Sequence, residues 1–421
     1  MTELFLLLAL ADPSPLTLKQ AVEMALARNP EVQIAHAQEE RARQAVREAR
    51  SSFIPSFVLG SGLAYTNGFP LSIEGSAPSV VNLVGNGQVL NIPQRHAIRE
   101  AQALERAGAS GATSRINDVV WRTAGAYLEL DRAARSLEVA RREATSLQKM
   151  EQWVAERVQG GLEIPLELTR ARLATARNRQ RLVALEGQAA TQEGVLRALL
   201  GLPADQPIRT VPDSLPPAVA EAKDEARAAG LALENNPELK RLAQEVQAKE
   251  SRVQAERAQR WPQMDLVAQY SVLSRFNNYD RFFRSFQRNN YELGLAMRLP
   301  VFNGTRISAR VGQAEAELTQ ARQALENARR NTALDVHRIF QRVRESEAAR
   351  EVAQLELEVA RENSTVSLAR YQEGRISARE LEQARLEESS RWSALLDAGF
   401  ELDRTRLELL KTTGEIARAL Q

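Results

Sequence analysis

The feature that most constrains this chain is a tandem duplication of about half its length. Asn29–Glu31 recurs as Asn236–Glu238, an offset of 207, and Gly161 recurs as Gly374, an offset of 213. Around these anchors the offsets also pair Val46 with Val253, Arg50 with Arg257, Pro55 with Pro262, Arg157 with Arg370 and Glu167 with Glu380. A unit near 200 residues is far longer than a solenoid repeat. We therefore expect two similar halves of one architecture.

The duplication sets the expected domain boundaries. Residues 1–15 form a signal-like N-terminal segment, because a short apolar run, MTELFLLLALA, opens the chain. The basic region that usually precedes such a run is missing, since the first Lys or Arg is Lys19. Repeat 1 covers 16–201, repeat 2 covers 221–421, and the Pro-rich stretch 202–220 links the two repeats.

Composition excludes several classes of protein. The 421 residues include 56 basic and 54 acidic side chains, a net charge of +2, which argues against a nucleic-acid-binding protein. There is no cysteine, so the chain has no disulfide, no thiolate metal site and no thiol nucleophile. Hydrophobic residues make up 43% and aromatic residues 5%, which suits long helices with narrow apolar seams. No run approaches the ~20 apolar residues of a transmembrane helix.

Each repeat begins with a helix and continues into a β-hairpin. Asn29 can cap the first helix, with Pro30 at its first position. After this helix the apolar period changes from 3.6 to 2, which predicts β-hairpins at about 53–92 and 262–302. The residues predicted for the apolar face of the strands include Phe57, Leu59, Leu266, Leu293, Leu295 and Met297.

Two interpretations of these hairpins are open from the pattern alone. One is a sheet that lies on a soluble core, although the flanking helices are too polar to supply much core. The other is part of a membrane barrel, apolar toward lipid and polar toward a lumen. Four strands cannot close a barrel, because about eight is the smallest number known. The second interpretation therefore requires strands from several chains.

Helical patterns of exceptional length follow each hairpin, at roughly 95–159 and 305–372. Each ends in a short break, at about 160–165 and 373–378, and a second helix returns. In the second break Gly374 suits a left-handed position, and Ser377 with Glu380 predicts a capping box. The breaks are therefore predicted to be the tips of helical hairpins.

The chain resembles the TolC-like outer-membrane efflux proteins over nearly its whole length. The resemblance is carried by LTLKQAVEMALARNPEV (16–32), its echo NNPEL (235–239), LPVFNGTRISARVGQAEAEL (299–318) and RYQEGRISARELEQAR (370–385). It implies a mainly α-helical homotrimer in which each chain gives four strands to a twelve-stranded β-barrel in outer-membrane lipid. The helices would form a periplasmic tunnel, and the trimer would serve as the passive exit duct of an efflux or type I secretion system.

The resemblance also implies a role for the hairpin tips. They would close the tunnel and meet a periplasmic adaptor protein that belongs to an inner-membrane pump. The positions carried over to this role are Gly161, Glu167, Arg370, Tyr371, Gly374, Arg375 and Glu380. Gln383 stands where a second acidic residue is common in the family, so a double acidic ring is not expected.

An enzyme is not expected. The three histidines, His36, His96 and His337, have no metal-ligand spacing, and no nucleotide-binding motif is present. We therefore predict no catalytic, cofactor or metal residues. The alternative to a channel is a soluble coiled-coil scaffold, which would purify without detergent. The sequence does not indicate whether the exported substrate is a drug, a metal or a protein.

Overall fold

The computed structural model describes residues 15–63, 78–211, 224–274, 284, 287–301 and 303–420. The chain forms two compact units, and each unit contains segments of both repeats. Unit 1 consists of Met1–His36, Ala112–Pro237 and Arg329–Gln421, and unit 2 consists of Ala37–Gly111 and Glu238–Ala328. The signal-like segment up to residue 14 and the linker from residue 212 lie outside the described residues.

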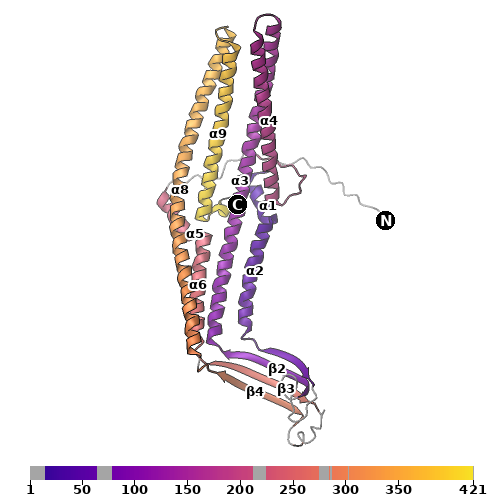
Figure 1. The fold of residues 1–421 in the computed structure, drawn as a ribbon, viewed down its shortest axis with the longest axis vertical. Coiled ribbons are helices and arrows are strands. Elements are labelled where there is room, and N and C mark those ends of the chain that lie inside the picture. Colours follow the sequence, from indigo (N-terminus) through magenta and orange to yellow (C-terminus); the bar gives the residue numbers. More distant parts are fainter. Residues whose placement is uncertain are drawn as a thin grey trace, which may run out of the picture. The chain divides into compact units, whose positions relative to one another are not determined.

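The described helices repeat in the same order in both halves of the chain (Figure 1). Repeat 1 contains α1 (Leu18–Arg28), α2 (Pro30–Ser51), α3 (Ile92–Gln159) and α4 (Pro165–Leu200). Repeat 2 contains α5 (Glu225–Asn235), α6 (Pro237–Ala258), α8 (Gly304–Gln372) and α9 (Ala378–Thr413), followed by α10 (Ile416–Leu420). α3 and α8 have 68 and 69 residues, so the two long helices predicted from the sequence are present.

The repeated Asn-Pro-Glu segments join each short helix to the end of a returning helix. Asn29 separates α1 from α2, and its Oδ1 accepts the N–H of Glu31 at 2.8 Å. Its Nδ2 donates to the carbonyl of Leu199 at 2.9 Å. In repeat 2, Asn236 Nδ2 donates in the same way to the carbonyl of Thr412 at 3.0 Å. The same motif recurs because each half needs the same cap and the same contact with the returning helix.

Glycine is required where each returning helix, α4 or α9, ends beside this Asn-Pro-Glu segment. α4 and α9 end at Gly201 and Gly414, with φ of 63° and 79°, in the left-handed region. A Cβ on Gly414 would lie 2.7 Å from the carbonyl oxygen of Asn235. A Cβ on Gly201 would lie 3.2 Å from the carbonyl oxygen of Arg28. Both the backbone conformation and the close approach therefore exclude larger residues.

The main hydrophobic core of unit 1 surrounds the start of repeat 1. Its buried side chains come from α1, α2, α3, α4, α9 and α10. Tyr127 is 1% exposed, and its hydroxyl lies 2.8 Å from the carbonyls of both Leu16 and Val211. Leu16 and Thr210 form a parallel β-bridge beside it. Tyr127 thus ties the beginning of repeat 1 to the segment that leaves it.

The strands of both repeats form one antiparallel sheet in unit 2, with the order β1-β2-β3-β4. β1 (Ser56–Gly62) and β2 (Ser79–Leu90) come from repeat 1, and β3 (Gln263–Leu273) and β4 (Asn289–Arg298) come from repeat 2. The two predicted hairpins are therefore confirmed. β1 and β4 are the edges of the sheet, and each has only one partner strand among the described residues.

The strand register places most of the large apolar residues of the four strands on one face. One row across the sheet is Leu59, Leu83, Tyr270 and Tyr291, and the next is Phe57, Gly85, Ala268 and Leu293. Leu266 pairs with Leu295, and Met264 pairs with Met297. Because side chains alternate along a strand, a slip of one residue would break this match. The six residues predicted for the apolar face thus share it.

The opposite face of the sheet is mainly polar. Asn82 Oδ1 accepts hydrogen bonds from Gln269 Nε2 at 3.1 Å and from Ser271 Oγ at 3.0 Å. Asp265 and Arg298 form an ion pair on the same face. Among the described residues, no helix is long and apolar enough to cross a membrane.

Candidate functional site at the hairpin tips

The tip between α8 and α9 reverses the chain with a Schellman motif. Gly374 has φ of +71°, and its N–H donates to the carbonyl of Tyr371 at 3.0 Å. The N–H of Arg375 donates to the carbonyl of Arg370 at 2.9 Å. These bonds satisfy carbonyls that the end of α8 would otherwise leave open. The left-handed position predicted for Gly374 is confirmed.

The tip between α3 and α4 has the same backbone design. Gly161 also has φ of +71°, and its N–H donates to the carbonyl of Val158 at 3.1 Å. The N–H of Leu162 donates to the carbonyl of Arg157 at 2.8 Å. These donors and acceptors lie 213 positions before their counterparts at the other tip. The internal repeat therefore extends to individual hydrogen bonds.

The returning helices begin differently at the two tips. Ser377 and Glu380 form the predicted capping box, in which one Glu380 oxygen accepts the N–H of Ser377 at 2.8 Å. This bond, followed by the one from the Ser377 hydroxyl, holds the pKa of Glu380 below its usual value. At the other tip Ile164 occupies the N-cap position without a side-chain cap, and Pro165 begins the helix. Glu167 there pairs with Arg170 at 2.5 Å.

Tyr371 connects the two hairpins within unit 1. Its ring lies edge-on to Trp153 of α3, with centroids 6.0 Å apart and an interplanar angle of 74°. The guanidinium of Arg157 lies 4.8 Å from the centroid of the same indole ring. Trp153 was not predicted from the sequence, and nothing in the local pattern distinguishes it. Arg375 is not part of these ring contacts, and it pairs with Glu373 at 3.1 Å.

A cavity of about 670 Å³ lies behind the tips, between α3, α4 and α9. Its lining residues include Trp153, Glu167, Arg170, Glu382 and Gln383. Burial, and then the charge of Glu167, raise the pKa of Glu382 above its usual value. Glu382 was not predicted as a site residue, although it lies two residues beyond Glu380. The cavity therefore places two carboxylates from different hairpins near each other.

A pH dependence follows from Glu382. A carboxyl group with a raised pKa in the folded state binds its proton more tightly than in the unfolded chain, so its ionisation destabilises the fold. Stability should therefore increase as the pH falls through the raised pKa. We expect Glu382→Gln to increase hydrogen-exchange protection at the start of α9 at neutral pH, with the gain vanishing at low pH. Glu387→Gln, exposed on the same helix, is the control, and equal gains for both variants would contradict the prediction.

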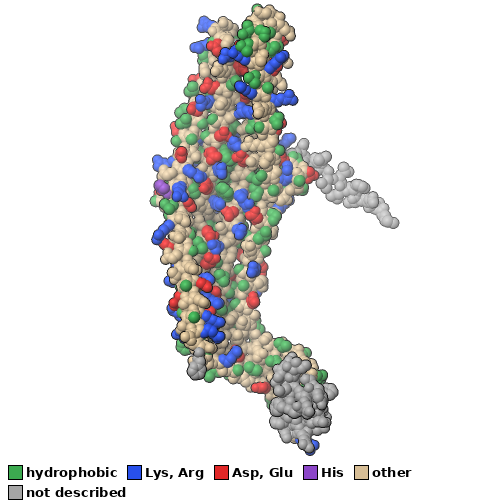
Figure 2. All heavy atoms as spheres, in the orientation of Figure 1, with side chains coloured by type: hydrophobic (Ala, Val, Ile, Leu, Met, Phe, Trp, Pro, Cys, Tyr) green, Lys and Arg blue, Asp and Glu red, His purple; other side chains and the backbone are tan. Residues whose placement is uncertain are grey.

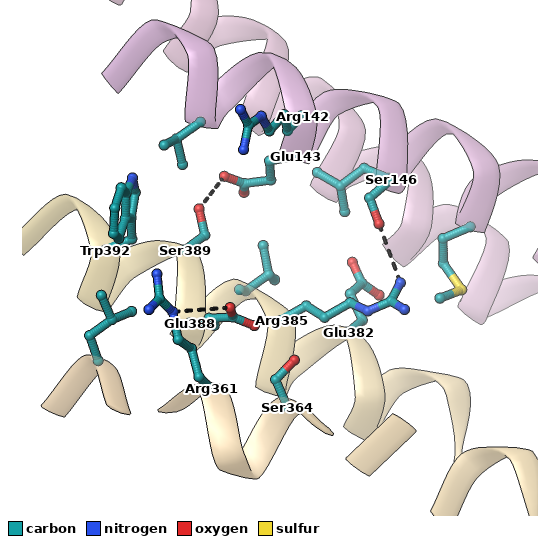
Figure 3. Close-up of a pocket in the computed structure, with 15 residues that line it drawn as sticks. Arg142, Glu143, Ser146, Arg361, Ser364, Glu382, Arg385, Glu388, Ser389 and Trp392 are labelled. Carbon is teal, nitrogen blue, oxygen red and sulfur yellow. Dashed lines mark hydrogen bonds and ion pairs between the residues drawn. The ribbon is translucent and has the colours of Figure 1, made fainter. Parts of the chain in front are cut away.

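A second groove, of about 440 Å³, lies farther along the hairpins between α3, α8 and α9 (Figure 3). The hydroxyl of Ser389 donates to Glu143 at 2.9 Å, and the guanidinium of Arg385 donates to the hydroxyl of Ser146 at 3.5 Å. Both contacts are marked in Figure 3. The guanidinium of Arg361 lies 5.1 Å from the centre of the Trp392 ring. Polar contacts therefore hold the two hairpins together along this groove. Figure 2 shows basic and acidic side chains interspersed over the helices, as the composition predicted.

Comparison with known proteins identifies a matching family and a relative of the chain. The model of the outer membrane efflux protein family matches residues 21–202 and 228–415, once in each repeat. The chain is 27% identical over 331 residues to Protein CyaE of Bordetella pertussis, covering 77% of this chain and 68% of that protein.

Solved structures share the fold. The outer membrane protein VceC of Vibrio cholerae matches with a TM-score of 0.77 at 19% identity, covering 94% of this chain and 96% of VceC. The open state of the Neisseria gonorrhoeae MtrE outer membrane channel matches with a TM-score of 0.76 at 17% identity, covering 94% and 88%. The chain therefore belongs to the outer membrane efflux protein family, a family of channels and not of enzymes.

Proposed function

We propose that the chain is a homotrimeric exit duct in the outer membrane. It passively conducts substrates that a periplasmic adaptor and an inner-membrane pump deliver. The observation that carries this proposal is the four-stranded sheet, which has one continuous apolar face and two edges, β1 and β4. Family membership supports a conduit over the coiled-coil scaffold.

The sheet suits lipid on one side and water on the other. On β4, Leu293 and Met297 are 74% and 67% exposed, although both are large and apolar. A sheet in lipid needs every backbone group paired, so its edges must close against other strands. Three copies supply twelve strands, enough to close a barrel, whereas one copy does not. The polar face, with Asn82, Gln269 and Ser271, would line the lumen.

The hairpin tips are the proposed contact with the adaptor and the proposed closure of the tunnel. Their backbones turn sharply at glycines, where another chain can approach closely. The proposed docking and gating positions are Gly161, Glu167, Arg370, Tyr371, Gly374, Arg375 and Glu380. Apart from Glu167 and Tyr371, which are partly buried, these residues are exposed in the single chain, as docking requires. The helical part would then lie in the periplasm.

Chemical cross-linking tests the assembly. We expect protein extracted from the outer membrane in mild detergent to cross-link into species of up to three chains and no more. Removing the detergent should cause aggregation, because the apolar face of the sheet would then meet water. Cross-linking in a large excess of an unrelated membrane protein controls for random collisions. A monodisperse monomer without detergent would refute the duct and favour the scaffold.

A further inference from the structure

Within unit 1, α4 and the part of α8 that lies there carry large apolar side chains that are exposed in the single chain. On α4 these include Leu166, Leu173 and Val183, which are 49%, 49% and 66% exposed. On α8 they are Val352, Leu355, Val359 and Val366, which are 46–66% exposed. We call these sets the α4 seam and the α8 seam. The buried side chains in this part of α8, such as Ala353 and Leu357, belong to a different row of the helix.

Both seams follow the heptad spacing of a coiled coil. Leu166 and Leu173 are seven residues apart, and Val183 completes the alternate row with Thr169 and Ala176. On α8, Val352, Val359 and Val366 repeat every seven residues, with Leu355 three residues after the first. Apolar residues at these two positions of a heptad form the contact between helices of a coiled coil. Each seam is thus one half of such a contact.

The charges beside the α4 seam are positive from Arg170 to Arg179. Arg170, Arg172, Arg177 and Arg179 occupy the two heptad positions that flank an apolar seam. Between Glu167 and Glu186 the helix carries five arginines and no acidic residue. The corresponding stretch of α9, residues 381–398, has four acidic residues and two arginines. The positive seam is therefore specific to one repeat and does not follow from the duplication.

The charges beside the α8 seam are negative. Glu351, Glu356 and Glu358 occupy its flanking positions, and Glu362 lies within it. Glu356 pairs with Arg391 at 2.9 Å, whereas Glu351, Glu358 and Glu362 form no ion pair with any residue in the described ranges. On α4, Arg177 and Arg179 likewise lack an ion pair within the described part of the chain. Side chains at these flanking positions determine which helices pair.

We propose that the α4 seam of one copy docks on the α8 seam of the next copy, with arginines facing glutamates. This inference rests on the proposed trimer and specifies how its helices join. α4 runs away from the tip and α8 runs toward it, so the two helices meet antiparallel when copies are related by rotation about the long axis of the hairpins. Arg179 and Glu358 each lie fourteen residues from the tip end of their helix, and therefore meet at one level.

This pairing suits a ring. Each copy carries one α4 seam and one α8 seam, so every contact joins unlike surfaces, and such contacts form a ring when the rotation between copies closes, as it does in the proposed trimer. Two α4 seams cannot pair with each other, because eight arginines would then face one another. An acidic helix of the adaptor is the other occupant that the α4 seam would fit. It does not explain why the same chain exposes an acidic seam of matching spacing.

Introduced cysteines test the contact directly, since the chain contains none. One chain carries Arg179→Cys and a second, differently tagged chain carries Glu358→Cys, and both are expressed in the same cells. We expect oxidation to join the two tags in one band of two chains. A chain with both substitutions should give bands of up to three chains. Arg179→Cys paired with Arg404→Cys on α9 is the control and should give no such band.

Charge reversal tests the energetics. We expect Arg177→Glu with Arg179→Glu to lower the yield of trimer by on the order of tenfold, because the two new glutamates would face the acidic α8 seam. Adding Glu358→Arg and Glu362→Arg in the same chain should restore most of the yield. Arg404→Glu, at an exposed position on α9, is the control for a change in net charge.

The outcomes separate the two proposals. Trimers without an interchain disulfide, and without any effect of charge reversal, would overturn the paired seams and leave the duct intact. Loss of adaptor capture from Arg177→Glu with Arg179→Glu, in trimers of normal yield, would assign the α4 seam to the adaptor instead. A wild-type protein that never forms trimers would refute the proposed function itself.

Discussion

Arginine at Leu295 is expected to remove most of the protein from the membrane. Leu295 lies on β4, is 61% exposed, and pairs across the sheet with Leu266 on the apolar face. A charged side chain near the middle of the bilayer costs about 2–4 kcal/mol in such a sheet. The lower figure already corresponds to about thirtyfold in the equilibrium of insertion. The measurement is the fraction of protein in outer-membrane pellets after extraction with alkali.

The neighbouring residue supplies the matched control. Ala296 pairs with Asp265, so its side chain lies on the polar face beside the ion pair of Asp265 and Arg298. An arginine there would remain near water and near a carboxylate, so Ala296→Arg should insert almost normally. Leu295→Ala separates loss of the leucine from gain of a charge, and we expect only a mild defect. Equal losses for Leu295→Arg and Ala296→Arg would show that the apolar face does not meet lipid.

The faces of the sheet could be predicted from the sequence because a strand has a period of two. Once Phe57 and Leu59 are assigned to one face of their strand, the face of every other residue in the strand follows, because successive side chains point to opposite faces. The order of the strands could not be read in this way. β2 pairs with β3 from the other repeat, and neither hairpin pattern indicates that long-range pairing.

The tips were predictable for a similar reason, since their signals are local. Glycine with a positive φ and a Ser377–Glu380 box both lie within one turn of chain. The contact of Trp153 with Tyr371 lies outside any such window, because 218 residues separate the two rings. The raised pKa of Glu382 also depends on a side chain from another hairpin, Glu167. The contacts between hairpins are therefore the part of the site that sequence periodicity and motifs cannot predict.

The repeated Asn-Pro-Glu motif likewise has one feature that local sequence predicts and one long-range contact that it does not. Capping of α2 by Asn29 follows from residue types alone. The hydrogen bond from its amide to Leu199, 170 positions away, does not. The heptads of the α4 and α8 seams were readable in principle, but a heptad does not say which of several neighbours covers it. Only the exposure of Leu173 and Val359 in the folded chain distinguishes these seams from the buried ones.

Tryptophan at Gly374 is expected to abolish capture of the adaptor while leaving the trimer nearly intact. The residue belongs to unit 1, whereas the sheet belongs to unit 2, so the change does not touch the strands. A Cβ at Gly374 would meet no atom within 4 Å, so a side chain there projects into open space. That space is where the proposed adaptor approaches the tip. The paired measurements are the trimer content of outer-membrane fractions and the adaptor that co-purifies with them.

Alanine at the same position separates bulk from strain. Both substitutions force a residue with a Cβ into φ of +71°, which costs about 1–2 kcal/mol. Only tryptophan adds bulk to the docking surface, so Gly374→Ala should retain most of the adaptor that the wild type captures. Equal loss for both variants would show that the Schellman turn is needed for its shape alone. Loss of the trimer itself would make Gly374 a folding residue. If Gly374→Trp captured as much adaptor as the wild type, the tip would not belong to the docking surface, because a partner bound there would collide with the tryptophan ring.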